Sequence, residues 1–389
     1  MNYRLIWLAL GAFVVGTGAF VIASLLPGIA GEMQVSMPQA GVLVLVYAIA
    51  YAIAAPLLST LTGAWDRRPI LVIAMVVFGL ANIGGGLAPT FEGIVIARIV
   101  MAAASGLFAA VAQGTAVYLS TPETRTRAIA IIVGGTTISV AFGAPIGSLI
   151  ANLMSWRAAF FVMGGVALLV ALVLQVLLPA KLPGSRLSMR ERVMVAFQPG
   201  IGSALVVTIA TIAAAFTVFT YIATLAHETG LPIEMLPLVL LSFGIGSVIG
   251  NYTSGQLADR IGPATTVRWV IAAAMLMLAG ISIVAHLFAA PVAGWVLMGI
   301  MLPWGMIGWG FPPAQSSHIV SLAPEAASIS LSLNVSAIYV GVALGSVIGG
   351  ANIALGSALD LGWAGAGLAL IAFGVHHYAN RRGRSIRVV

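Results

Sequence analysis

Arg98 is the residue whose type and position point most directly to chemistry, because it lies inside the apolar run 93–119. An arginine in hydrocarbon costs at least about 2.5–3.5 kcal/mol on insertion scales, so its side chain should face the interior of a helical bundle. That location would make Arg98 a fixed charge at mid-membrane depth. The alternative is that Arg98 extends to the membrane surface and pairs with Glu92, which precedes the same run.

Groups that could release and rebind a proton are few. Every Asp and Glu lies near the end of an apolar run rather than at its middle. Because an arginine does not readily release its proton, the candidates for a proton carrier are His318, His286 and Glu92. A histidine at a helix end is more often interfacial than part of a relay. The residues alone therefore leave the proton carrier open.

Motifs of intramembrane enzymes are missing. The chain has no His-Glu-x-x-His pair, no Gly-x-Ser-x-Gly on an apolar run and no paired acids at mid-run depth. It also has no cysteine, which rules out disulfides and thiolate metal sites. We expect a protein that is not an enzyme and that uses no cofactor and no metal.

Long apolar runs must position these groups. Hydrophobic residues make up 61% of the 389 residues and charged residues 7%, too few to cover the surface of a water-soluble protein. A helix that crosses about 30 Å of hydrocarbon needs about 20 mainly apolar residues, and the polar alternation of barrel strands is absent. The sequence therefore predicts an all-α membrane protein with about twelve transmembrane helices, at 6–26, 39–61, 70–87, 93–119, 128–151, 158–178, 200–225, 233–256, 265–287, 291–319, 328–351 and 361–378.

Basic residues are concentrated in alternate gaps between these runs. With the N-terminus inside, nearly all of them fall on the cytoplasmic side, where Lys and Arg of short loops are held during insertion. The formal net charge of +7 then reflects topology and contact with anionic membrane lipid, and a nucleic-acid partner is unnecessary. We expect a monomeric, multi-pass protein of the cytoplasmic (inner) membrane with both termini in the cytoplasm.

The two halves of the chain repeat each other. The longest hydrophilic stretch separates six spans in residues 1–179 from six in residues 200–389. Three matches occur in the same order in both halves: Asp66-Arg67 with Asp259-Arg260, Pro122-Glu123 with Pro324-Glu325, and Gly143-Ala-Pro-Ile-Gly147 with Gly345-Ser-Val-Ile-Gly349. The sequence predicts two pseudo-symmetric six-helix bundles, joined by a cytoplasmic linker at 180–199 and followed by a short basic tail.

This organisation resembles the major facilitator superfamily, and the segment Gly255-Gln-Leu-Ala-Asp-Arg-Ile-Gly262 after the eighth span carries the likeness. Other segments are similar to the arabinose efflux permease branch of the drug:proton antiporters: Gly16-Thr17, Leu25-Leu-Pro-Gly-Ile-Ala30, Asp66-Arg67-Arg68, Trp156-Arg-Ala-Ala-Phe160 and Gly341-Val-Ala-Leu-Gly345. The resemblance implies that substrate binds near the midplane between the halves and that access alternates by rocking.

The resemblance also implies roles for the charged residues. Asp66 with Arg67, and Asp259 with Arg260, would latch a cytoplasmic gate, and Arg98 would take part in proton coupling. An Asp beside a helix terminus and a basic partner gains about 0.3–1 kcal/mol from the helix dipole. The alternative reading of both Asp-Arg pairs is a solvated topology signal.

Two features bear on direction and coupling. Gly143, Pro145 and Gly147 resemble the Gly-Pro-Gly signature of antiporters, which implies export, while close packing of helices is the structural alternative. In this branch a Glu usually stands two residues after Thr17, and here that position is Ala19. This departure favours an uncoupled carrier.

Polar and aromatic residues at mid-run depth are the candidates for substrate contact. They are Thr17, Tyr51, Gln113, Thr137, Trp304, Trp309, Asn334 and Tyr339. Each could instead bind a neighbouring helix, with a hydrogen bond worth about 0.6 kcal/mol in membranes. Together they describe a mainly apolar cavity suited to a small neutral or weakly anionic organic molecule.

We therefore expect a secondary active transporter that exports small organic molecules, such as sugars, nucleosides or drugs, by alternating access in exchange for protons. The alternative within transport is an uncoupled facilitator or an uptake carrier of a small metabolite. The alternative outside transport is a membrane receptor or scaffold, which short loops disfavour because they leave little surface for a soluble partner.

Overall fold

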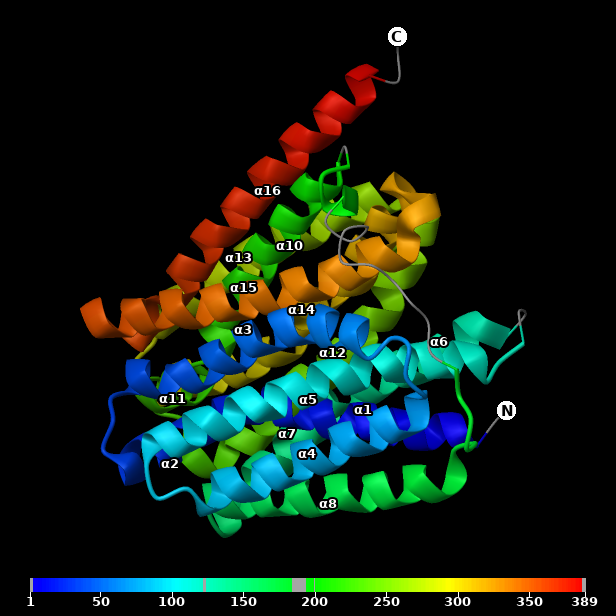
Figure 1. Cartoon of the computed structure of the whole chain (residues 1–389). Coiled ribbons are helices and arrows are strands. Elements are labelled where there is room, and N and C mark those ends of the chain that lie inside the picture. Colours follow the sequence, from blue (N-terminus) through cyan, green and yellow to red (C-terminus); the bar gives the residue numbers. More distant parts are fainter. Residues whose placement is uncertain (1–2, 122–123, 184–193, 199, 387–389) are drawn as a thin grey trace. The chain divides into compact units, whose positions relative to one another are not determined.

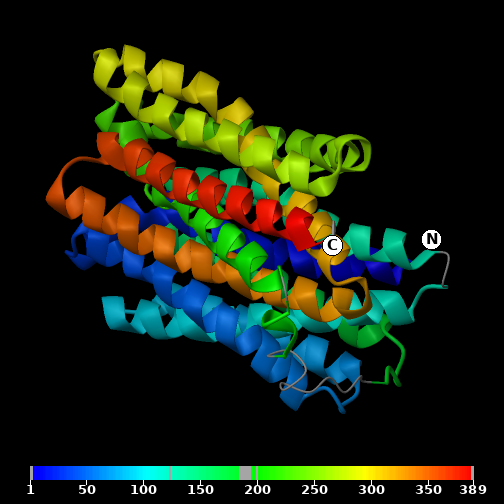
Figure 2. The same cartoon turned by 90° about the horizontal axis from the view of Figure 1, so that it is seen from above.

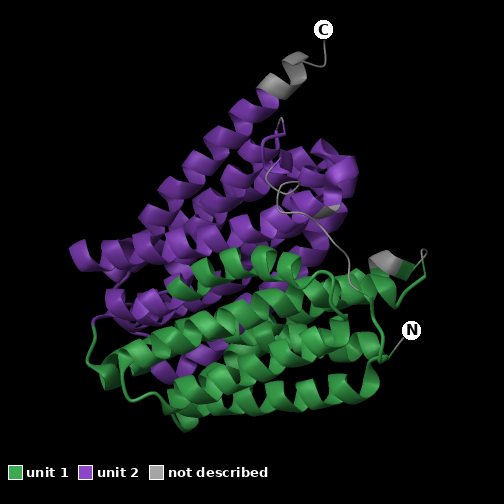
Figure 3. Ribbon diagram, in the orientation of Figure 1, with its two compact units in different colours: residues 1–35, 46–189 green, residues 36–45, 190–389 purple. Residues whose placement is uncertain are grey.

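The computed structural model describes residues 3–121, 124–183, 194–198 and 200–386, and all of them lie in helices or connecting loops (Figures 1 and 2). The repeat at Pro122-Glu123 and the greater part of the predicted linker 180–199 lie outside the described residues. The chain divides into two compact units (Figure 3): unit 1 comprises Met1–Val35 and Val46–Met189, and unit 2 comprises Ser36–Leu45 and Arg190–Val389.

Unit 1 is built from the helices of the N-terminal half. They are α1 (Arg4–Phe20), α2 (Ile22–Met33), most of α3 (Met37–Leu61), α4 (Arg67–Leu87), α5 (Phe91–Tyr118), α6 (Arg125–Ile138), the π-helical turn η2 (Ser139–Gly143), α7 (Ala144–Leu153) and α8 (Trp156–Leu177). Within this unit α4 packs against both α5 and α8, and α1 packs against α6 and η2.

Unit 2 is built from the helices of the C-terminal half together with the first residues of α3. They are α10 (Ile201–Phe219), α11 (Ile222–Glu228), η3 (Ile233–Met235), α12 (Leu236–Ile261), α13 (Pro263–Leu287), α14 (Val292–Leu322), η4 (Pro324–Ala326), α15 (Ala327–Leu355), η5 (Ala358–Asp360) and α16 (Leu361–Ile386). Here α14 packs along α12 and α13, while α10 packs along α15 and α16.

The predicted number of membrane spans is confirmed. Among the described residues, 11 helical segments are each long and apolar enough to cross a membrane, and α1 with α2 makes a further span that is bent by 46°. The segments from α3 to α8 and from α10 to α16 correspond to the apolar runs of the sequence. The protein is therefore an all-α, multi-pass membrane protein.

Side-chain caps explain where several helices begin. Thr90 Oγ1 accepts a hydrogen bond from the backbone N–H of Gly93 at 3.2 Å at the start of α5, and Ser155 Oγ accepts one from Ala158 at 3.2 Å at the start of α8. Such caps satisfy one of the backbone donors that a helix N-terminus leaves unpaired. Short polar residues thus separate consecutive spans at defined positions.

Two of the predicted spans are not continuous α-helices. The first run bends at Val21, between α1 and α2. The fifth passes through the π-helical turn η2, which ends at Gly143, two residues before Pro145. A proline has no N–H to offer the carbonyl four residues earlier and its ring crowds that carbonyl, so a wider turn relieves the conflict.

Candidate functional site

Arg98 is buried in unit 1, with 2% of its surface exposed. Its Nη1 donates a hydrogen bond to the carbonyl oxygen of Gly18 at 2.7 Å, and its guanidinium lies 4.1 Å from the centroid of the Tyr47 ring. Gly18 belongs to the last turn of α1, where carbonyls lack intrahelical donors. Arg98 therefore lies inside the bundle, and the alternative in which it pairs at the surface with the exposed Glu92 is not what the structure shows.

Tyr47 is held in place from α5. Its hydroxyl donates to Ser105 Oγ at 2.9 Å, and both side chains are buried. Helices α3 and α5 also approach each other closely at Gly106, the residue after Ser105, because a Cβ at Gly106 would come within 2.9 Å of Ala55 Cβ. The missing side chain at Gly106 thus allows α3 to carry its tyrosine over the guanidinium of Arg98.

These contacts define the chemistry of the site in unit 1. The two partners named above, a carbonyl and an aromatic face, are both neutral, and both stabilise a guanidinium cation. Tyr51 lies one turn along α3, is 6% exposed, and its ring centroid is 6.4 Å from that of Tyr47. The arrangement is a buried cation beside two aromatic rings, which suits an anionic or electron-rich group.

The predicted Gly-Pro-Gly segment forms a packing surface against α1. A Cβ at Gly143 would overlap Thr17 Oγ1, and a Cβ at Gly147 would overlap the side chain of Val21. Pro145, between them, is buried. Thr17 itself is 7% exposed and lies in this contact, so the observed contacts are those of close helix packing. A contact between Thr17 and substrate stays a prediction.

Asp66 anchors the loop before α4 through backbone groups. Its Oδ1 accepts a hydrogen bond from the N–H of Arg68 at 3.0 Å, and its Oδ2 accepts one from the N–H of Leu182 at 3.0 Å. The side chains of Arg67 and Arg68 donate to backbone carbonyls of α5 and α8. The expectation that neighbouring arginines pair with Asp66 is therefore wrong for the described residues, whose ion pairs do not include such a contact.

The second copy of the Asp-Arg pair is built differently. Asp259 and Arg260 are both exposed in the last turn of α12, and among the described residues neither side chain forms a hydrogen bond or an ion pair. The sequence repeat therefore does not correspond to a repeat of contacts. Only the loop at Asp66 has the contacts of an anchored structure.

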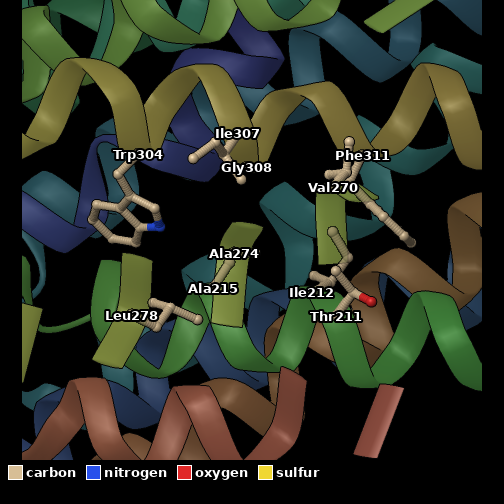
Figure 4. Close-up of a pocket in the computed structure, with 10 residues that line it drawn as sticks. All are labelled: Thr211, Ile212, Ala215, Val270, Ala274, Leu278, Trp304, Ile307, Gly308 and Phe311. Carbon is tan, nitrogen blue, oxygen red and sulfur yellow. The ribbon is translucent and has the colours of Figure 1, made fainter. Parts of the chain in front are cut away.

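Unit 2 contains an aromatic cluster with a small cavity beside it. Trp304 is 1% exposed, and its ring centroid lies 4.9 Å from that of Phe243, which also contacts Phe219 at 5.0 Å and Trp309 at 6.1 Å. Figure 4 shows Trp304 at one end of the cavity and Thr211 at the other. The remaining lining residues are Ile212, Ala215, Val270, Ala274, Leu278, Ile307, Gly308 and Phe311.

Asn334 belongs to a buried hydrogen-bond cluster of unit 2. Thr208 Oγ1 donates to Asn334 Oδ1 at 2.7 Å, and Gln315 Nε2 lies 3.1 Å from the same hydroxyl. This cluster ties α10, α14 and α15 together, as the helix-contact alternative for Asn334 predicts. Gln113 is exposed, and Thr137 and Tyr339 are half-buried, so their contact with substrate stays a prediction.

The histidines considered as proton carriers lie in different settings. His286 Nε2 is 2.8 Å from Asp360 Oδ1 in a partly exposed pair. His318 is 7% exposed, and its ring meets that of His376 at a centroid distance of 5.5 Å. Sequence reasoning missed His376, and likewise Tyr47, because each meets its partner only through the packing of distant helices.

About twelve membrane-spanning helices in two units, with a buried cation on α5, are typical of a membrane transport protein. The chain matches the family model described as Major Facilitator Superfamily over residues 8–346, and it belongs to that family of transporters. It is 31% identical over 379 residues, 95% of each chain, to the inner membrane transport protein YdhP of Escherichia coli strain K12. It is 27% identical over 375 residues, again 95% of each, to the uncharacterized MFS-type transporter YbcL of Bacillus subtilis strain 168.

Solved structures show the same fold at low sequence identity. A bacterial homologue of the human lysosomal transporter Spinster, in an inward-facing and unoccupied conformation, aligns with a TM-score of 0.74 at 16% identity and covers 98% of this chain and 97% of its own. The nucleoside transporter NupG, as its D323A mutant, aligns with a TM-score of 0.79 at 12% identity and covers 97% and 100%. The family match and the curated relatives make this protein a transporter of small molecules and not an enzyme.

Proposed function

We propose that this transporter exports small neutral or weakly anionic organic molecules in exchange for protons. The observation that carries the proposal is the buried guanidinium of Arg98, which keeps its charge between Gly18 and the Tyr47 ring. A desolvated cation attracts the negative pole of a substrate and repels a proton, so its site can favour one over the other. Export and proton exchange are also what the likeness of residues 143–147 to antiporters implies.

The aromatic cluster in unit 2 supports the substrate class. Phe219, Phe243 and Trp304 offer apolar faces, and the described residues around the cavity add no charged side chain. Such surroundings suit an uncharged organic ring or a molecule with few polar groups. Sugars, nucleosides and neutral drugs are therefore the substrates to test first.

An uncoupled facilitator is the second candidate, and one observation favours it. Ala19 occupies the position at which the related branch usually has a Glu, directly after Gly18, whose carbonyl accepts the hydrogen bond from Arg98. Without a carboxylate there, proton exchange requires another titratable group. The two candidates differ in whether a pH gradient drives flux.

Efflux from proteoliposomes tests the proposal. The purified protein is reconstituted and a panel of sugars, nucleosides and amphiphilic drugs is measured with and without an imposed pH gradient. Flux that rises several-fold with the gradient supports antiport. Flux of the same compound that ignores the gradient supports the facilitator instead.

We also propose that the protein lies in the inner membrane as a monomer, with both termini in the cytoplasm and anionic lipid along its basic loops. The inner-membrane relative and the distribution of Lys and Arg support this arrangement. The proposed bundles are residues 1–179 and 200–389, with the linker between them. Fusion of a fluorescent protein and of alkaline phosphatase to the C-terminus tests the orientation, since only a periplasmic end would give phosphatase activity.

A further inference from the structure

Gln315 is the centre of a buried polar cluster in unit 2 that the transport site described above does not include. Its side chain is fully buried, and Nε2 donates to the carbonyl oxygen of Ala204 at 2.7 Å and to Thr208 Oγ1 at 3.1 Å. Its Oε1 is buried and finds no hydrogen-bond partner among the described residues. A buried amide oxygen in this state lacks the bond it would have in water.

Two more unpartnered polar atoms lie one helical turn to either side. Thr211 Oγ1 is on α10, three residues after Thr208, and His318 Nδ1 is on α14, three residues after Gln315. Residues three apart on a helix share a face, and each step advances about 4.5 Å along the axis. Thr211 is 5% and His318 7% exposed. The residues that carry these three atoms therefore follow one another along the contact between α10 and α14, and we call this row of residues the line.

The line begins at the cavity of Figure 4. Thr211 and Phe311 line the cavity at the end away from Trp304, and Phe311 is one turn before Gln315 on α14. The cavity has about 20 Å³ of free volume, which accommodates one water molecule. A carbonyl is also available at its wall, because Pro312 has no N–H to offer the carbonyl of Gly308.

The line ends at a pair of histidines. The rings of His318 and His376 meet edge-on, at 70° and 5.5 Å between centroids. His376 Nε2 lies 2.8 Å from the carbonyl oxygen of Ala264 in the first turn of α13, so that nitrogen carries the proton and donates. The side-chain nitrogen of Asn380, one turn further along α16, lies 2.9 Å from the same Nε2, and because a protonated Nε2 cannot accept, this contact is not a second hydrogen bond. The pair thus lies at the end of unit 2 where α12 passes into α13.

The groups around the pair disfavour a stored positive charge. The helices packed on this end carry the following titratable or charged side chains: Arg268 on α13, His377 and Arg381 on α16, Tyr339 on α15, the exposed Glu325 on η4, and the exposed Asp259 and Arg260 on α12, with none on α10. Arg268 and His377 lie within electrostatic range of His376. Because like charges repel, the two imidazoles cannot both be positively charged at once, so a proton that turns one of them into an imidazolium is passed on.

We propose that ordered waters run inside unit 2 from the Thr211 end of the cavity past Gln315 to His318, and that His318 and His376 pass protons between these waters and the α12–α13 end. In one transfer a protonated water gives a proton to Nδ1 of His318, and Nε2 of the same ring passes its proton to the unprotonated ring nitrogen of His376. His376 then releases its Nε2 proton to water at the α12–α13 end. The His318 ring gains no net proton, and its rotation restores the first tautomer. The inference that waters are present depends only on the unpartnered atoms, whereas their role in coupling rests on the proton exchange proposed above.

Nuclear magnetic resonance of the whole protein in nanodiscs tests the waters without any substrate. The chain has 5 histidines, so selective ¹⁵N-histidine labelling gives few signals, and His318→Gln assigns that of His318. The expected result is an unprotonated Nδ1 that exchanges magnetisation with water. A protonated Nδ1, or one without water contact, would overturn the proposal.

Transport by matched variants tests the proton route. The assay uses the panel compound with the largest wild-type flux and compares exchange at equal pH with flux driven by a pH gradient. His318→Gln is expected to keep exchange within about twofold and to lose the response to the gradient, while the control His227→Gln, an exposed histidine on α11, keeps both. A preserved response in His318→Gln, or loss of exchange in a variant that purifies normally, contradicts the proposal.

Thr211→Val provides a second variant, because it removes a hydroxyl while keeping the shape of the side chain. Its control is Thr217→Val on the same helix, where the hydroxyl already bonds to the Ala213 carbonyl at 2.8 Å. We expect Thr211→Val to slow gradient-driven flux several-fold more than the control. Equal rates in the two variants would contradict the proposed row of waters. If wild-type flux itself ignores the gradient, proton exchange fails as the function, while the resonance measurement still decides the waters.

Discussion

The guanidinium of Arg98 and the ring of Tyr47 face each other at 4.1 Å, although α3 and α5 carry them far apart in the sequence. The same guanidinium binds the Gly18 carbonyl at 2.7 Å. One planar group thus contacts a ring face and a carbonyl at once, and this combination is specific to arginine.

Replacing Arg98 with lysine should lower transport at least about tenfold. A lysine keeps the charge, but its compact ammonium cannot both stack on Tyr47 and reach Gly18 with a rigid fork. A desolvated cation–π contact is worth about 2 kcal/mol, which exceeds the 1.4 kcal/mol of a tenfold effect. Flux in proteoliposomes is the measurement. Tyr47→Phe is the matched control, since it keeps the ring face and loses only the bond to Ser105, and transport by Arg98→Lys equal to that of Tyr47→Phe would exclude the stacking from the mechanism.

Gly143→Ala should destabilise unit 1 and reduce transport. The added methyl would overlap Thr17 Oγ1 at the contact between α1 and η2. Overpacking of this kind costs about 1–3 kcal/mol. Gly134→Ala is the control, because a Cβ there meets no atom within 4 Å. Thermal unfolding followed by tryptophan fluorescence measures both, and equal melting temperatures would mean that the helices do not pack as closely as the structure shows.

Asp66→Ala should lower stability by about 0.5–2 kcal/mol, the usual worth of an N-cap. The change removes the acceptor for the N–H groups of Arg68 and Leu182. Asp259→Ala should leave the melting temperature unchanged, since the exposed Asp259 forms no bond among the described residues. The comparison is made by fluorescence-detected size-exclusion after heating. Equal losses in the two variants would show that the repeated pairs act alike.

Arg157→Ala should be more destabilising than Glu32→Gln, although the two residues form one ion pair at 2.9 Å. Arg157 also donates to the carbonyls of Gly86 at 2.6 Å and Ala88 at 3.0 Å at the end of α4. The half-exposed pair is worth at most about 1 kcal/mol, so Glu32→Gln removes little. Thermal melts of both variants in the same detergent measure the order. A larger loss of melting temperature for Glu32→Gln would show that the carboxylate, and not the carbonyl contacts, stabilises the end of α4.

Much of the architecture followed from local properties of the sequence. Apolar runs predicted the number of spans because each run must satisfy its own backbone hydrogen bonds in lipid, whatever its neighbours are. The cost of an arginine in hydrocarbon predicted that Arg98 faces inward for the same reason. Short polar residues such as Thr90 and Ser155 marked helix starts, since a cap acts within three residues.

The partners of these groups were decided only by the tertiary structure. The residues near Arg98 in the sequence do not predict its contact with Tyr47, and those near His318 do not predict its contact with His376, because such contacts depend on how distant helices pack. The Asp-Arg repeat predicted a latch in each half, and among the described residues Asp66, but not Asp259, binds a second segment, at Leu182. A sequence pattern specifies which side chains are available, whereas side-chain contacts within about 3 Å require the chain to be folded.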